Sequence, residues 1–167
     1  MQRVAVLGSG GAGKSALADA IAARTGLPVV HLDVLYWKPG WTQPPPEEFA
    51  ALLGDAVARD RWILDGNFLR DGDDPRFGRA DTVIVLDLPR TTCLWRVLKR
   101  RIQEAHRPRR DLPAGCRETV DLSFLGWVWR YPDRSLPRVL AQLEGLDGVD
   151  VRRLRSTDDV KEYLDSL

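Results

Sequence analysis

The chain has 167 residues, a formal net charge of +1 and 44% apolar residues. This length is typical of one domain that buries its own core, so it needs no disulfides or structural metal. The near-neutral charge argues against a surface coated with basic side chains for nucleic acid, and no apolar stretch reaches the roughly 18 residues of a membrane span.

Short apolar runs alternate along the chain with segments of helical spacing. The strand candidates are Arg3–Leu7, Pro28–Leu32, Trp62–Leu64, Thr82–Leu86 and Val149–Leu154. The helix candidates are Lys14–Arg24, Pro46–Arg59, Thr91–Ala105, Arg117–Trp129 or beyond, Arg134–Leu143 and Asp158–Leu167. This alternation predicts an α/β fold, a parallel sheet with helices on both faces, whose ligands bind beyond the carboxyl ends of the strands.

The cysteines and the start of the chain bear on its compartment. Cys93 and Cys116 lack the C-x-x-C spacing of zinc and redox sites, and they indicate no disulfide. The first strand candidate begins at Arg3, which leaves no room for a signal peptide. We therefore expect a reduced, cytoplasmic protein with no membrane partner, present as a monomer or a homodimer.

A glycine-rich stretch joins the first strand candidate to the first helix candidate. Residues 8–15 read Gly-Ser-Gly-Gly-Ala-Gly-Lys-Ser and fit the pattern G-x-x-x-x-G-K-[ST]. Its glycines let backbone N–H groups face phosphate oxygens, and the helix N-terminus adds a favourable dipole. Lys14 is expected to reach the β- and γ-phosphates, and the Ser15 hydroxyl to ligate Mg²⁺. The predicted triphosphate contacts are Gly8, Gly10, Gly11, Ala12, Gly13, Lys14, Ser15 and Ala16.

Two carboxylates follow strand candidates on the predicted ligand side. Asp33 comes after the second strand and Asp65 after the third. One carboxylate can hold Mg²⁺ and the other can orient or deprotonate an acceptor hydroxyl. We assign Asp65 to the metal and Asp33 to the substrate; the alternative is that either residue only caps a turn.

Basic residues gather between Arg90 and Arg110, where Glu104 is the only acid. Arginines stabilise the charge that spreads over a transferred phosphoryl group, and a closing loop excludes water. Arg96 and Arg100 share one helical face, and a proline-broken loop follows. Together with Arg107, Arg109 and Arg110 of that loop, these arginines are predicted to form a lid. The alternatives are a solvated helix face and a nucleic-acid contact, for which no reader motif is present.

Aromatic and polar side chains supply the remaining candidates. Tyr36, Trp37 and Trp41 follow Asp33 and either line an acceptor pocket or simply pack together. A later group, Phe124, Trp127, Trp129 and Tyr131, is predicted to belong to the core or to helix packing. Candidate substrate contacts after the third strand are Asn67, Arg70, Arg76 and Arg79, with Asn67 the strongest. Ser156 with Asp159 fits a capping box, and the adjoining loop, which includes Arg155, is expected near the adenine.

Several of these pieces occur together in one known family. The glycine stretch, His31-Leu32-Asp33, the run Trp37–Trp41, Asp65-Gly66-Asn67, Ala80–Ile84 and Cys93–Arg96 resemble the topology modulation protein family, bacterial P-loop proteins similar to adenylate kinase and shikimate kinase. The resemblance covers nearly the whole chain.

The wider kinase resemblance implies a three-layer P-loop NTPase fold with sheet order 2-3-1-4-5. It also implies ATP with Mg²⁺ as cofactors and an arginine-bearing lid at about 106–117 within a single domain spanning 1–167. In this comparison Asp65-Gly66 matches the Asp-Gly of adenylate kinases, Arg96, Arg100 and Arg107 resemble lid arginines, and Arg155 lies in the adenine-side loop. Asn67 departs from the pattern, because adenylate kinases have a Phe-Pro-Arg run there.

Two functions are consistent with these features. The first is a phosphotransferase that moves the γ-phosphate of ATP to a small-molecule acceptor, with Lys14, Asp33, Arg100 and Arg107 as catalytic residues and Asp33, Trp37 and Asn67 as acceptor contacts. The second is a nucleotide-binding regulator of DNA topology, which the family name suggests. A nucleotide-binding protein without chemistry is a third reading.

Overall fold

The computed structural model describes residues 1–68, 74–103 and 121–167 of the chain. Its elements, in chain order, are β1 (Arg3–Gly8), α1 (Lys14–Thr25), β2 (Val29–His31), α2 (Leu32–Tyr36), α3 (Pro46–Ala58), β3 (Trp62–Asp65), β4 (Thr82–Leu86), α4 (Arg90–Gln103), α5 (Leu122–Arg134), α6 (Leu136–Leu143), β5 (Asp150–Leu154) and α7 (Thr157–Asp165). The predicted helix 117–129 therefore begins at Leu122 in its described part and extends to Arg134.

The five strands form one parallel sheet in the order β2-β3-β1-β4-β5, as predicted. The strand β1 lies at its centre, and all but its first residue is buried. Because successive side chains of a strand point to opposite faces, Val4 and Val6 pack on one side and Ala5 and Leu7 on the other. Both faces of the sheet are therefore apolar and require cover.

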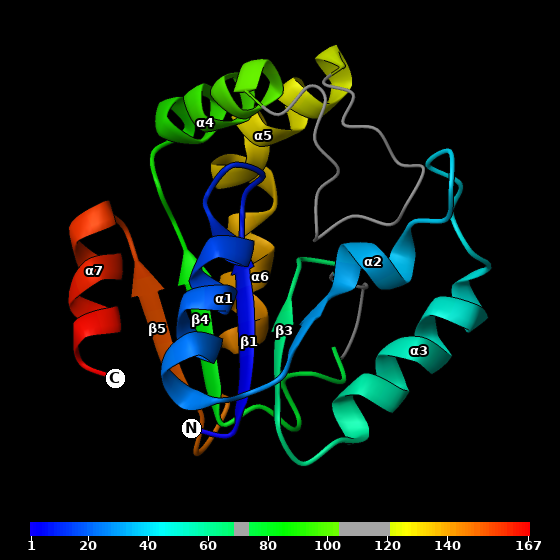
Figure 1. The fold of residues 1–167 in the computed structure, drawn as a ribbon, viewed down its shortest axis with the longest axis vertical. Coiled ribbons are helices and arrows are strands. Elements are labelled where there is room, and N and C mark those ends of the chain that lie inside the picture. Colours follow the sequence, from blue (N-terminus) through cyan, green and yellow to red (C-terminus); the bar gives the residue numbers. More distant parts are fainter. Residues whose placement is uncertain (69–73, 104–120) are drawn as a thin grey trace.

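Helices supply that cover in two layers (Figure 1). The helices α1 and α7 pack on the face of Val4 and Val6, and α3 and α6 pack on the face of Ala5 and Leu7. Near the carboxyl end of β1, α4 and the first turns of α5 lie across the molecule (Figure 1). The result is the predicted three-layer α/β fold.

One element was not predicted. The chain after β2 turns into α2, so Asp33 lies in the first turn of a short helix and not at a strand end. Leu32 is fully buried, and Leu35 and Tyr36 pack against the same core cluster, which gives this stretch the spacing of a helix.

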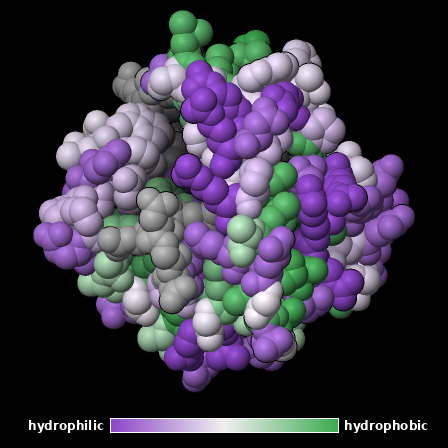
Figure 2. All heavy atoms as spheres, turned by 180° about the vertical axis from the view of Figure 1, so that it is seen from behind, coloured by the Kyte–Doolittle hydropathy of each residue, from purple (hydrophilic) through white to green (hydrophobic). Residues whose placement is uncertain are grey.

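The aromatic residues of α5 divide between core and surface. Tyr131 is buried, whereas 38% of Trp127 and 47% of Trp129 are exposed. These two rings pack on helix side chains, Trp127 against Phe124 and Tyr131, and Trp129 against Arg90 of α4, so helix packing is the alternative that fits them. Viewed from behind, apolar atoms also gather at the upper end of the molecule, where α4 and α5 lie (Figure 2). Exposed apolar side chains of these helices include Ile102 and Leu122.

In the described ranges 1–68, 74–103 and 121–167, none of the helices has the length and apolar character that a membrane span needs.

Candidate functional site

The glycine-rich loop leaves the sheet at Gly8 and enters α1 at Lys14. A Cβ atom on Gly11 would lie 2.2 Å from the Cys93 carbonyl oxygen, so the loop packs directly on the backbone of α4. Gly13 is the N-cap of α1 and has a φ of +97°, and as a glycine it has no side chain that could cap the helix. Lys14 directs its Nζ to the Ser9 carbonyl oxygen at 3.2 Å, which bends the lysine back over the loop.

The first turn of α1 contains no acidic residue. Its N–H groups and the positive end of the helix dipole are therefore not neutralised by a side chain of this turn. A loop of this shape at such a helix end binds phosphate. The loop and helix expected from Gly8–Ser15 are thus present in the fold, and their contacts with a nucleotide stay a prediction.

Arg96 connects α4 to this loop. Its Nη1 donates to the Ala12 carbonyl oxygen at 3.2 Å and lies 3.7 Å from where a Cβ of Gly13 would be. Arg100 follows one turn later on α4. Arg107 and the predicted lid at 106–117 lie outside the described residues.

Cys93 lies behind the loop and is buried. Burial raises the pKa of its thiol, against a lowering by the nearby charges of Arg96 and Lys14. Its Sγ approaches the Leu88 carbonyl oxygen at 3.8 Å. Cys93 is therefore a packing residue and not an activated nucleophile.

Asp65 ends β3 and is almost entirely buried. Its Oδ2 lies 2.8 Å from Nδ1 of His31, the last residue of the neighbouring strand β2. His31 also places Nε2 3.6 Å from Oδ1 of Asp19 on α1. The pair Asp65–His31 was not predicted, because sequence patterns do not show which strand ends become neighbours.

The aromatic residues after β2 pack against one another. Tyr36 contacts Trp37, Phe49 and Phe68 with ring centroids 4.8, 5.0 and 4.5 Å apart, and Trp37 contacts Trp41 at 5.2 Å. Packing, one of the two predicted alternatives, is therefore observed. Their use as an acceptor pocket stays a prediction, as does that of Asp33, which precedes them.

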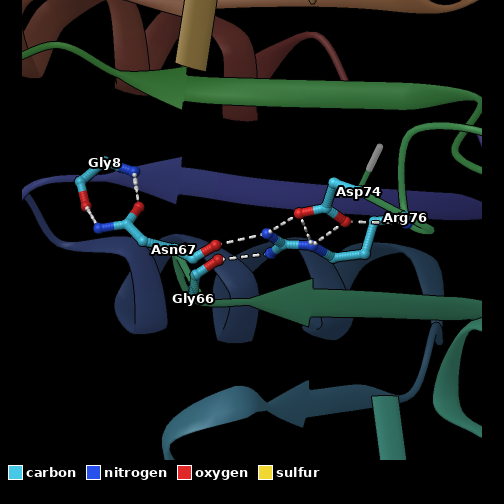
Figure 3. Close-up of polar contacts among 5 residues, drawn as sticks. All are labelled: Gly8, Gly66, Asn67, Asp74 and Arg76. Carbon is cyan, nitrogen blue, oxygen red and sulfur yellow. Dashed lines mark hydrogen bonds and ion pairs between the residues drawn. The ribbon is translucent and has the colours of Figure 1, made fainter. Parts of the chain in front are cut away.

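Asn67 lies beside the loop and not in open solvent. Its Oδ1 accepts from the Gly8 N–H at 2.9 Å, and its Nδ2 donates to the Gly8 carbonyl oxygen at 2.7 Å (Figure 3). These two bonds give its amide a role in holding the loop. The contact of Asn67 with an acceptor stays a prediction.

Arg76, another candidate substrate contact, is fully buried, which corrects that assignment. Its guanidinium donates to both carboxylate oxygens of Asp74, to the Gly66 carbonyl at 2.6 Å and to the Asn67 carbonyl (Figure 3). A guanidinium offers five N–H donors in one plane, so one arginine side chain can bind the carboxylate and both carbonyl oxygens at once.

Arg155 follows β5 and is exposed. It lines a pocket of about 420 Å³ with six other residues, Asp87, Leu88, Pro89, Arg90, Thr91 and Pro132. The adjoining capping box is confirmed, because Ser156 and Asp159 exchange side-chain and backbone hydrogen bonds. The adenine contact of Arg155 stays a prediction.

Comparisons with solved structures show that several kinases share this fold. Neither models of protein families nor curated proteins match the chain. Among solved structures, a sugar kinase from Janibacter sp. HTCC2649 has a TM-score of 0.53 and 19% identity over 99% of this chain and 93% of its own. A gluconokinase from Sinorhizobium meliloti 1021 has a TM-score of 0.54 and 19% identity over 98% and 87%. Shikimate kinase from Acinetobacter baumannii, solved with shikimate, has a TM-score of 0.51 and 14% identity over 99% and 90%.

At these identities the likeness concerns the fold. The chain has the fold of P-loop kinases, with the predicted strand order.

Proposed function

We propose that the chain is an ATP-dependent phosphotransferase acting on a small molecule. The observation that carries the proposal is the glycine-rich loop, which meets an α1 N-terminus without acidic residues and carries Lys14 at its end, in a fold shared with kinases. Such loops bind the phosphates of nucleotides. The triphosphate would contact the backbone of residues 8–16, and the adenine would lie near Arg155.

Two buried polar atoms support a ligand at this site. In the described part of the chain, Oγ of Ser9 and Oδ1 of Asp65 are buried and have no hydrogen-bond partner. Buried polar atoms are rarely left unpaired, so each fits a group that ligand binding would bring. For Asp65 that group would be Mg²⁺ or a water molecule bound to it, with Ser15 as the second residue that holds the ion. When bound, Mg²⁺ would neutralise charge on the β- and γ-phosphates.

The reaction transfers one phosphoryl group. The acceptor oxygen would bond to the γ-phosphorus, the bond from that phosphorus to the β–γ bridging oxygen would break, and ADP would leave. Asp33 would take the proton of an acceptor hydroxyl. Lys14, Arg100 and Arg107 would stabilise the charge on the moving group.

The proposal also covers the acceptor side of the site. Trp37 would face the acceptor, and membership of the topology modulation protein family, which the sequence motifs suggest, is part of this proposal. No observation on the described residues favours a regulator of DNA topology, so we advance the kinase alone.

Calorimetry of MgATP binding tests the first step. The unmodified protein should bind MgATP, and Lys14→Ala should weaken binding at least tenfold because the triphosphate loses its cation. Lys161→Ala, which removes an exposed lysine on α7, is the matched control and should bind normally. No binding by the unmodified protein would refute the proposal.

A panel of small alcohols and phosphates then tests the second step. An acceptor should stimulate ADP release by the unmodified protein and not by Asp33→Asn. If no compound across sugars, nucleosides and shikimate-like alcohols stimulates release, the kinase reading fails.

A further inference from the structure

The strands β1 and β3 separate where the glycine-rich loop begins. Up to that point their ladder is regular, and its last bond runs from the Gly66 N–H to the Val6 carbonyl oxygen at 3.2 Å. A continued parallel ladder would next join the Gly8 N–H to the Gly66 carbonyl. That bond does not form. One side chain binds the Gly8 N–H, and another binds the Gly66 carbonyl oxygen.

Asn67 takes the place of the missing strand partner. Its amide accepts from the Gly8 N–H and donates to the Gly8 carbonyl, at 2.9 and 2.7 Å. The carbonyl oxygen that Gly66 would have offered accepts instead from Nη1 of Arg76 at 2.6 Å. The ladder therefore ends with its backbone groups paired, although the two strands diverge.

Arg76 holds Asn67 in this position. It binds the carbonyl oxygens of Gly66 and Asn67 with one guanidinium, and the buried carboxylate of Asp74 fixes that guanidinium from the other side (Figure 3). Because Asp74 and Arg76 are buried, the Asn67 backbone has few alternatives to its observed place.

Gly8 is confined on its other side as well. It pairs with Leu86 of β4, and a Cβ on Gly8 would lie 2.7 Å from the Leu86 carbonyl oxygen. The first residue of the loop is thus held between Leu86 and Asn67. Since the following N–H groups must point at phosphate oxygens, a shift of Gly8 would misalign the entire loop.

We propose that Asn67, held in place by Arg76, is a positioning residue of the triphosphate loop. It acts through Gly8 and needs no contact with the nucleotide. This inference rests on the proposed function, because it requires that the loop bind a triphosphate. It assigns to Asn67 a different task from the acceptor contact predicted from the sequence.

The test compares Asn67→Ala with Arg61→Ala, an exposed substitution at the opposite end of β3. MgATP affinity is measured by calorimetry, and exchange of the Gly8 amide hydrogen by NMR without nucleotide. Asn67→Ala should raise the MgATP Kd at least tenfold and speed Gly8 exchange, with circular dichroism like that of the control.

Four outcomes decide the matter. An unchanged Kd for Asn67→Ala, or exchange at Gly8 as slow as in the control, would overturn the inference. Where Arg76→Lys folds, it should also raise the Kd, and wild-type affinity would overturn the part assigned to Arg76. If the unmodified protein does not bind MgATP, the proposed function itself is refuted, while the Gly8 exchange still reports on the Asn67 contact.

Discussion

The buried pair Asp74–Arg76 allows a quantitative test of the structure. Its two side chains are 1% and 0% exposed, and the closest N–O distance is 2.6 Å. Removing one member of a buried ion pair leaves the other charge without compensation, at a cost of about 3–5 kcal/mol. We therefore expect Arg76→Met to lower the free energy of unfolding by about that amount, a large part of the roughly 5–15 kcal/mol typical of a folded domain.

A double-mutant cycle isolates the pair. Asp74→Leu alone should cost about 3–5 kcal/mol, because it strands the guanidinium charge. The double variant buries no charge, and its cost should come mainly from the unpaired Gly66 and Asn67 carbonyls, at about 1–3 kcal/mol each. Taking central values of about 4 kcal/mol for the double variant and about 8 kcal/mol for the summed single ones, we expect a coupling of about 4 kcal/mol.

Urea unfolding followed by far-ultraviolet circular dichroism measures the three variants and the unmodified protein. The slope with urea should stay the same, so that midpoints report stability. Additive single costs, within about 0.5 kcal/mol, would mean that the two side chains do not act as a buried pair. A small loss for Arg76→Met would refute its burial.

Three further outcomes follow from local geometry. Gly11→Ala should lower the free energy of unfolding by about 2–5 kcal/mol, because it combines a positive φ with a clash against α4. Gly26 has a φ of +67° and open space around it, so Gly26→Ala should cost only about 1–2 kcal/mol. Equal losses of stability in thermal melts would contradict this packing. The pKa of Asp159 is lowered, chiefly by the hydrogen bond from the Ser156 side chain and next by that from the Arg155 backbone. The ionised carboxylate therefore stabilises the fold above the ordinary Asp pKa of about 3.9, and this stabilisation is lost as pH falls through the lowered pKa. Melts of Asp159→Asn should therefore approach those of the unmodified protein at acid pH, and a constant difference would refute the cap. Arg96→Met should weaken MgATP binding about tenfold by calorimetry, since it removes a charged donor from the loop, and unaltered affinity would exclude that role.

The sequence predicted what depends on local pattern. Apolar strand runs and helical spacing predicted the sheet and its cover, and the run from Gly8 to Ser15 predicted the loop, since its chemistry is carried by adjacent residues. The capping box of Ser156 and Asp159 was equally local and is confirmed.

Contacts between residues that are far apart in the sequence were not predicted. His31 and Asp65 are 34 positions apart and meet only because β2 and β3 are neighbours. Arg76 is an arginine in a connecting segment, a position where exposure is the usual outcome, and no pattern in the sequence signals its burial. Asn67 was predicted to contact the acceptor, and its hydrogen bonds to the backbone of Gly8 were not predicted.

The two edges of the sheet resist pairing with another chain. The edge strand β2 has only three residues, Val29–His31, and offers a short template. At the other edge, β5 carries Arg152 bound to Asp150 and Arg153 bound to Asp87. A strand added beside β5 would have to displace or desolvate these ion pairs. Charged side chains at one edge and a short strand at the other therefore oppose sheet extension and aggregation.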